Sequence, residues 1–268
     1  MAAKPQLSTR EILAFHVEAG VDVALQEKPV NRFALPANEP PAPAIPAQRP
    51  LPIIAPAPRA EAAAPAAPDS AVMEARVAAK RAQTLEELRE TLKRFEGCAL
   101  SATATQLVFA DGRPGARVMF VGEAPGAEED REGLPFVGRS GKLLDRMIAA
   151  IGMKRSEVYI ANIVPWRPPG NRTPTPQESA ICLPFIRRQI ELADPDFLVV
   201  MGKPAMQTLL GINEGIRGVR GRWVDYDTGT RTIRALVMFH PAYLLRSPNE
   251  KRHSWRDFMA LKKALAGK

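Results

Sequence analysis

Residues 116–122 read ARVMFVG, and the chain continues over 122–126 as GEAPG. The first stretch is a short, nearly continuous apolar run, which is typical of a strand buried on both faces of a sheet. The glycines and the proline that follow predict a tight turn whose backbone amides are open to a ligand. Three more runs of this kind occur later: VYIANIV at 158–164, DFLVVMG at 196–202 and IRALVMF at 233–239.

Helical patterns separate these runs. They include GKLLDRMIAAIG at 141–152 and PQESAICLPFIRRQIELA at 176–193, and two more helices are predicted ahead of the first strand. Asp69 is expected to cap the first of those, and Thr84 with Glu87 to form a capping box for the second. Strands that alternate with helices favour an α/β fold with a mostly parallel sheet covered on both faces.

The composition divides the chain into three parts. Residues 1–35 contain a predicted helical segment, TREILAFHVEAG, and residues 36–68 form a Pro/Ala-rich linker that cannot build a packed core. The folded domain is expected over 69–268. The N-terminal segment either docks back onto the domain or binds a partner.

The charge favours a polyanionic partner, because the formal net charge is +8 and the pI is near 9.8. Cys98 and Cys182 are the two cysteines of the chain and form no CxxC pair, so no disulfide framework or zinc site is indicated. No apolar run is long enough to cross a membrane, and no signal peptide is recognisable. We expect a soluble, cytoplasmic, monomeric protein.

Polar side chains follow three of the four predicted strands. Glu123 follows the first, Asn162 lies at the end of the second, and His240 comes directly after the last. In parallel α/β sheets, ligands bind beyond the carboxyl ends of the strands. These three side chains are therefore expected to share one crevice.

Four segments carry a family resemblance: GEAPG at 122–126, EDREGLPFVGRSGKLLD at 129–145, ANIVPWRPPGNRTPTPQE at 161–178 and HPAYLLR at 240–246. Together they resemble family 4 of the uracil-DNA glycosylase superfamily. The resemblance implies a three-layer α/β/α fold with a central, mostly parallel four-stranded sheet. It also implies an enzyme of base excision repair, which flips uracil out of DNA and hydrolyses the N-glycosidic bond, leaving an abasic site.

The resemblance assigns roles to individual residues. Gly122, Ala124 and Gly126 belong to the loop that approaches the sugar and the uracil O2, with Glu123 and Glu129 as its acids.

The base itself is assigned to three other side chains. Phe136 would stack on the flipped uracil, Asn162 would read its Watson–Crick edge, and His240 would donate to O2 as negative charge builds there. The residues expected to contact DNA, including a wedge in the segment AYLLR, are Arg167, Arg172, Leu244, Leu245, Arg246, Lys251 and Arg252.

The chain departs from the family pattern at the metal cluster. Family 4 members usually hold a four-iron cluster with four cysteines, whereas here only Cys98 and Cys182 match and Phe95 and Trp166 replace the other two. A cubane cluster normally needs four ligands. We therefore expect no cluster and no other metal.

Ala124 stands where other branches of the superfamily carry a water-positioning aspartate. Either Glu123 supplies the base, or a merely positioned water suffices. No motif places a lysine as a Schiff-base nucleophile, so a monofunctional enzyme is expected. The alternative is a non-catalytic module that recognises uracil or abasic sites and recruits repair proteins through the N-terminal helix and the Pro/Ala linker. The partner expected for the N-terminal segment is a repair or replication protein.

Overall fold

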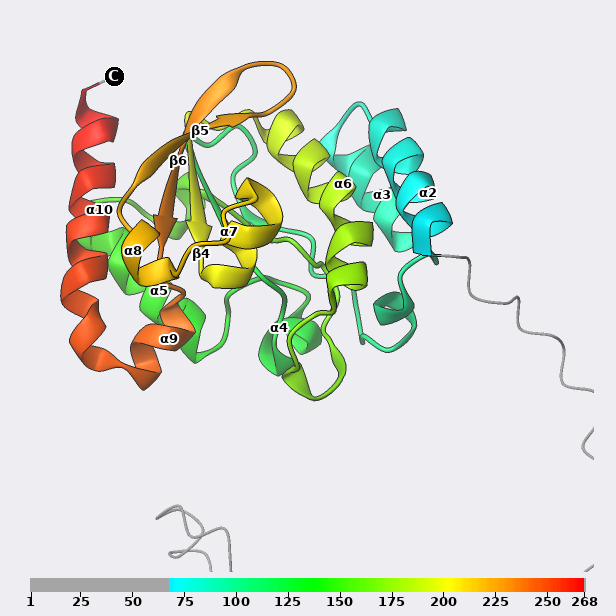
Figure 1. The fold of residues 1–268 in the computed structure, drawn as a ribbon, viewed down its shortest axis with the longest axis horizontal. Coiled ribbons are helices and arrows are strands. Elements are labelled where there is room, and N and C mark those ends of the chain that lie inside the picture. Colours follow the sequence, from blue (N-terminus) through cyan, green and yellow to red (C-terminus); the bar gives the residue numbers. More distant parts are fainter. Residues whose placement is uncertain (1–67, 268) are drawn as a thin grey trace, which may run out of the picture. The chain divides into compact units, whose positions relative to one another are not determined.

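The computed structural model describes residues 68–267, and the predicted N-terminal helical segment and most of the linker lie outside them. The described chain forms one sheet between helices (Figure 1). The strands are β1 (Asp111–Gly112), β2 (Val118–Gly122), β3 (Tyr159–Asn162), β4 (Phe197–Met201), β5 (Trp223–Asp227) and β6 (Thr232–Met238). The helices are α2 (Pro68–Arg81), α3 (Leu85–Lys93), α4 (Ala127–Glu132), α5 (Arg139–Ala150), α6 (Pro176–Ala193), α7 (Lys203–Leu210), α8 (Ile216–Val219), α9 (Pro241–Arg246) and α10 (Lys251–Ala266). Short 3-10 turns are η1 (Ala99–Ala102), η2 (Arg155–Glu157), η3 (Pro169–Asn171) and η4 (Pro248–Glu250).

The sheet has the strand order β1-β3-β2-β4-β6-β5. Its four inner strands are mutually parallel and correspond to the four apolar runs of the sequence. The two edge strands, β1 and β5, pair antiparallel with their neighbours. The expectation of a four-stranded sheet was thus correct for the parallel core and wrong for the edges. β1 has two residues and β5 is only partly buried, so neither carries a continuous apolar signal.

Alternate residues of the strands point into two separate cores. Met119 and Val121 of β2 face one core together with α2, α3, α6 and α7. Val118 and Phe120 face the other core, to which α5 and α10 contribute. The chain therefore has the three-layer arrangement that was predicted, with helices on both sides of the sheet (Figure 1).

Two predicted helix starts differ in detail. α2 begins at Pro68, so Asp69 lies inside the first turn and does not precede it. Thr84 does accept a hydrogen bond from the Glu87 amide, but the Glu87 carboxylate accepts from the amide of Gln83 and not from that of Thr84. The predicted capping box is therefore only half formed.

Candidate active site

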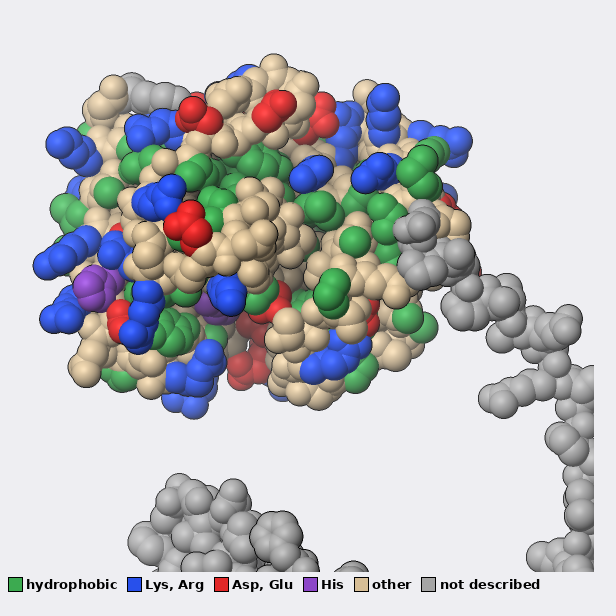
Figure 2. Space-filling view, in the orientation of Figure 1, with side chains coloured by type: hydrophobic (Ala, Val, Ile, Leu, Met, Phe, Trp, Pro, Cys, Tyr) green, Lys and Arg blue, Asp and Glu red, His purple; other side chains and the backbone are tan. Residues whose placement is uncertain are grey.

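The candidate active site lies at the end of the sheet where the connections between parallel strands switch from one side of β2 to the other. From β2 the chain passes to β3 on one side of it, and then crosses to β4 on the other side. Such a switch point leaves a crevice at the carboxyl ends of the strands. A pocket of about 680 Å³ occupies this place, and residues that follow all four parallel strands line it. Figure 2 shows acidic side chains and a histidine in a hollow of this face, with lysines and arginines around it.

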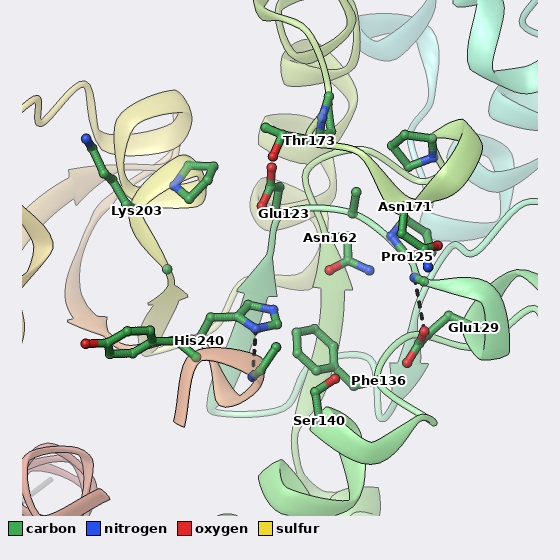
Figure 3. Close-up of a pocket in the computed structure, with 18 of the residues that line it drawn as sticks. Glu123, Pro125, Glu129, Phe136, Ser140, Asn162, Asn171, Thr173, Lys203 and His240 are labelled. Atoms are coloured by element: carbon green, nitrogen blue, oxygen red, sulfur yellow. Dashed lines mark hydrogen bonds between the residues drawn. The ribbon is translucent and has the colours of Figure 1, made fainter. Parts of the chain in front are cut away.

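Asn162 ends β3 directly beside Gly122 of β2, as the strand register requires. Its side chain is 4% exposed, and its Oδ1 atom has no hydrogen-bond partner within residues 68–267. An unsatisfied buried acceptor costs about 1–3 kcal/mol, so this amide is built to meet a donor from a ligand. Figure 3 shows the amide pointing into the pocket near Phe136 and His240.

Glu123 follows β2 and lines the same pocket. Its Oε1 atom is buried and lacks a hydrogen-bond partner in the described part of the chain. Burial raises the pKa of Glu123 above its ordinary value. The carboxylate lies toward Thr173 in Figure 3, and it retains an acceptor for a proton or a water.

Phe136 adopts a left-handed backbone conformation with φ of 54°. Its buried ring stands 5.3 Å from the imidazole of His240, measured between ring centroids. Gly122 makes this packing possible, because a Cβ atom there would lie 2.5 Å from Asn162 Oδ1 and 2.6 Å from Phe136 Cζ. Gly122 does not line the pocket; it leaves the space that the Asn162 amide and the Phe136 ring occupy.

His240 is the N-cap residue of α9. Its Nδ1 atom accepts a hydrogen bond of 3.1 Å from the backbone N–H of Ala242. Burial, followed by the charge of Arg246, lowers the pKa of His240 to about 4. The imidazole is therefore neutral at physiological pH and carries its proton on Nε2, which can donate to a ligand.

Glu129 lies on the wall of the pocket but is not a free acid. Its carboxylate accepts hydrogen bonds from the backbone amides of Gly126 (3.0 Å), Val137 (3.1 Å) and Gly138 (2.9 Å). These bonds join the turn after β2 to the loop that carries Phe136, as part of Figure 3 shows. Backbone donors thus engage both of its oxygens, and Glu129 holds two loops together. Its assignment as a catalytic acid stays a prediction.

The glycine-rich turn itself lies at the pocket. Ala124, Pro125 and Gly126 all contribute to the lining. Ala124 places no acid there, as the sequence already indicated.

The predicted DNA-binding cations differ in their surroundings. Arg246 is exposed on the rim of the pocket, while Lys251 and Arg252 are exposed beside a second, apolar pocket. Arg172 lines the main pocket but forms a two-pronged ion pair with Glu178 of its own chain.

Arg167 is also engaged within the chain. It donates to Asn171 at 2.7 Å and lies 3.8 Å from a carboxylate oxygen of Asp130. Of the five predicted cations, Arg246, Lys251 and Arg252 are thus the ones for which no ion pair is found within the described residues.

The predicted wedge is corrected at one position. Leu244 is fully buried, because α9 turns it toward the interior beside Phe258 and Leu143. Leu245 is partly exposed and is the leucine of this pair that can reach DNA.

Several residues of the pocket were missed by the sequence reasoning. They are Ser140, Asn171, Thr173, Lys203 and Tyr243. Lys203 directly follows β4 and Gly202, so the rule that found Glu123, Asn162 and His240 would have found it too. Lys203 thus lines the pocket although no motif places a lysine as a nucleophile, and its amine points away from Asn162 and His240 in Figure 3.

The region of the two cysteines does not fit a four-iron cluster. Cys98 and Cys182 are buried, and their sulfurs lie 4.0 Å apart. Phe95 and Trp166 are buried in the same core. Residues 68–267 contain no group of three or more His, Cys, Asp or Glu side chains that could hold a metal ion. The donor set is thus short of the four ligands that a cubane needs.

Comparison with known proteins agrees with the geometry. Residues 109–260 match the uracil DNA glycosylase superfamily, and the chain belongs to that superfamily. It is similar to the type-4 uracil-DNA glycosylase of Thermotoga maritima, with 42% identity over 174 residues that cover 64% of this chain and 89% of that protein. It is also similar to the type-4 uracil-DNA glycosylases of Archaeoglobus fulgidus (35% identity, 66% and 90% covered) and Sulfurisphaera tokodaii (38%, 67% and 84%). None of the described helices is both long and apolar enough to span a bilayer.

Proposed function

We propose that the protein is a uracil-DNA glycosylase that excises uracil from DNA and leaves an abasic site. The observation that carries the proposal is the buried, unpartnered Oδ1 of Asn162, which shares one pocket with Phe136 and His240. One amide can accept from N3–H of uracil and donate to its O4, which is the pattern that distinguishes uracil from cytosine. Similarity to type-4 uracil-DNA glycosylases supports the same substrate.

In this proposal, unstacking the base costs a few kcal/mol, and new contacts between the base and the pocket offset this free energy. The flipped uracil stacks on Phe136 and pairs with Asn162. The neutral imidazole of His240 donates from Nε2 to O2, because Nδ1 is already bonded to Ala242.

The reaction breaks the bond between C1′ of deoxyribose and N1 of uracil. The bonding electrons leave with the base, and the negative charge gathers on O2, where a fixed donor lowers the barrier. A water molecule adds its oxygen to C1′ and loses a proton. We propose that Glu123 accepts this proton, since it has a buried, unpartnered oxygen and a raised pKa. The uracil anion then takes up a proton on release.

The DNA duplex is proposed to contact the rim of the pocket. Arg246, Lys251 and Arg252 are available for phosphates, and Leu245 for the gap left by the base. Arg167 and Arg172 could contact phosphates only after giving up their hydrogen bonds to Asn171 and Glu178. We further propose a monomer that works on chromosomal DNA in the cytoplasm without a metal cluster, since Phe95 and Trp166 fill the space of two cluster ligands.

A labelled oligonucleotide with one uracil tests this function. Purified protein should give a product that breaks only after alkali treatment. His240→Ala and Asn162→Ala should lower the single-turnover rate by about 100-fold or more, as for loss of a transition-state donor. His253→Ala and Asn213→Ala, which change the same residue types outside the pocket, should stay near wild type.

Other outcomes identify other functions. Tight binding of uracil-containing DNA without product would support the non-catalytic module. The lack of an acid at Ala124, which lines the pocket, also favours this alternative. Strand breakage without alkali would reveal lyase chemistry, and trapping of Lys203 by borohydride would locate it.

A further inference from the structure

We propose that Arg155 is a positioning residue that holds Phe136 in the backbone conformation needed for stacking on the base. The inference rests on the proposed function, because it concerns the ring assigned to the flipped uracil. Arg155 belongs to η2, ahead of β3, and does not line the pocket.

The backbone around Phe136 is both crowded and strained. A non-glycine residue in the left-handed region costs on the order of 1–3 kcal/mol and persists only where its surroundings enforce it. Gly141 approaches so closely that a Cβ atom there would lie 1.7 Å from the Phe136 carbonyl oxygen. The surrounding structure therefore maintains a strained backbone at Phe136 and holds its carbonyl group in one place.

The guanidinium of Arg155 meets that carbonyl and its neighbour. Nη1 donates to the Phe136 carbonyl at 3.1 Å, and Nη2 donates to the Pro135 carbonyl at 2.6 Å. Two consecutive peptide carbonyls are thus bound by one rigid, planar group. Because the carbonyl direction defines the peptide plane, these bonds oppose relaxation of Phe136 to a negative φ.

Two carboxylates fix the guanidinium from its other edges. Nε donates to Asp111 at 2.6 Å, and Nη1 donates to Asp145 at 2.8 Å. Asp111 lies in the edge strand β1 and Asp145 in α5, so the arginine is anchored to two separate elements. The two ion pairs compensate the charge of Arg155 and fix its position. Arg155 with these two carboxylates thus forms a clamp on the loop that carries Pro135 and Phe136.

A double-mutant cycle separates positioning from general stability. Arg155→Met keeps the apolar stem and removes all donors, and Phe136→Leu removes the ring. Each is expected to lower single-turnover uracil excision by about 30- to 100-fold, since small misplacements of a binding group have effects of this size. If Arg155 acts through Phe136, the double variant should fall within about threefold of the slower single variant.

Arg117→Met is the matched control. Arg117 also bridges a carboxylate, Asp196, and a carbonyl, that of Leu265, but neither partner belongs to the loop that carries Phe136. It should leave excision within about threefold of wild type, in contrast to Arg155→Met. Multiplicative effects of Arg155→Met and Phe136→Leu would overturn the inference.

Two further arms keep the test decisive. If Arg155→Met does not fold, Arg155→Lys retains the charge but has only three donors for the four acceptors that Arg155 binds, and it lacks the planar guanidinium; the same coupling to Phe136→Leu is expected. If wild-type protein binds uracil-containing DNA without excising the base, the proposed function fails, and the cycle is measured on its preference for uracil- over thymine-containing DNA. Lack of coupling in that preference would overturn the role of Arg155 independently.

Discussion

The Nδ1 atom of His240 accepts a hydrogen bond from the backbone N–H of Ala242, two residues further on in the first turn of α9. The bond fixes both the orientation and the tautomer of the ring. It also satisfies one of the amides that a helix leaves unpaired at its start. The same side chain thus caps a helix and presents Nε2–H to the pocket.

The pH dependence follows from the depressed pKa of His240, which is about 4. The unfolded chain binds this proton near pH 6.5, whereas the folded chain resists it until about pH 4. Stability should therefore fall as the pH drops through this window. Excision should show no rise on acidification through about pH 6.5, the ordinary pKa of histidine, when single-turnover rates are measured from pH 8 downward. A rate that increases with protonation near pH 6.5 would show that the imidazolium is the active form.

Glu123→Gln tests the proposed base. The carboxylate has a raised pKa because it is buried, so its protonation should produce the acid limb of the wild-type profile. The variant should be slower and should lose this limb. A single-turnover rate within about threefold of wild type, roughly 0.6 kcal/mol, would exclude general base catalysis and favour a merely positioned water.

Gly122→Ala should damage the pocket while leaving the fold intact. The added methyl would displace both the Asn162 amide and the Phe136 ring, which lie within 2.6 Å of its position. We expect excision to fall by about 100-fold, with circular dichroism like that of wild type. Gly218→Ala is the control, because nothing lies within 4 Å of its Cβ position. Normal excision by Gly122→Ala would contradict the close packing of these three residues.

The parallel core and the three polar side chains at its edge could be predicted, because both depend on local signals. Apolar runs mark the inner strands, and Glu123, Asn162 and His240 follow such runs directly. Lys203 has the same kind of signal and was missed because the segment after β4 was not considered.

Other features depend on tertiary contacts that no local pattern contains. The burial of Leu244 follows from how α9 packs, and the engagement of Glu129 follows from amides eight and nine residues away. The clamp on Phe136 joins residues from β1, α5 and η2. Sequence spacing alone cannot bring these groups together.

Glu129→Gln should reduce stability and excision together. An amide side chain has one acceptor oxygen in place of two and brings an unwanted donor toward backbone N–H groups. Loss of charge-assisted bonds of this kind costs about 1.5–3 kcal/mol each, so the melting temperature should fall by several degrees. Glu128→Gln, at the exposed neighbouring position of α4, is the matched control. A Glu129→Gln protein with normal stability but no activity would instead support its assignment as a catalytic acid.

The cysteine pair should be dispensable for catalysis. The double variant Cys98→Ala, Cys182→Ala should retain excision within about threefold of wild type, at the cost of two small buried cavities. Both thiols should resist alkylation until the protein unfolds, because both are buried. The hydrogen bond that Cys182 donates to Cys98 raises the pKa of Cys182 and lowers that of Cys98, so Cys98 should react first once it is exposed. Stoichiometric iron and acid-labile sulfide in anaerobically purified protein would contradict the proposal that no cluster is bound.

The four strands that surround the pocket lie far apart in the sequence, and β6 with His240 comes last among them. During synthesis on the ribosome, the first three of these strands emerge before His240, the residue proposed to donate to the leaving base. A nascent chain that ends before His240 thus has no complete pocket, and the proposed excision would require the whole sheet to have assembled. Such an activity would report complete folding, and truncated products of the gene would lack it.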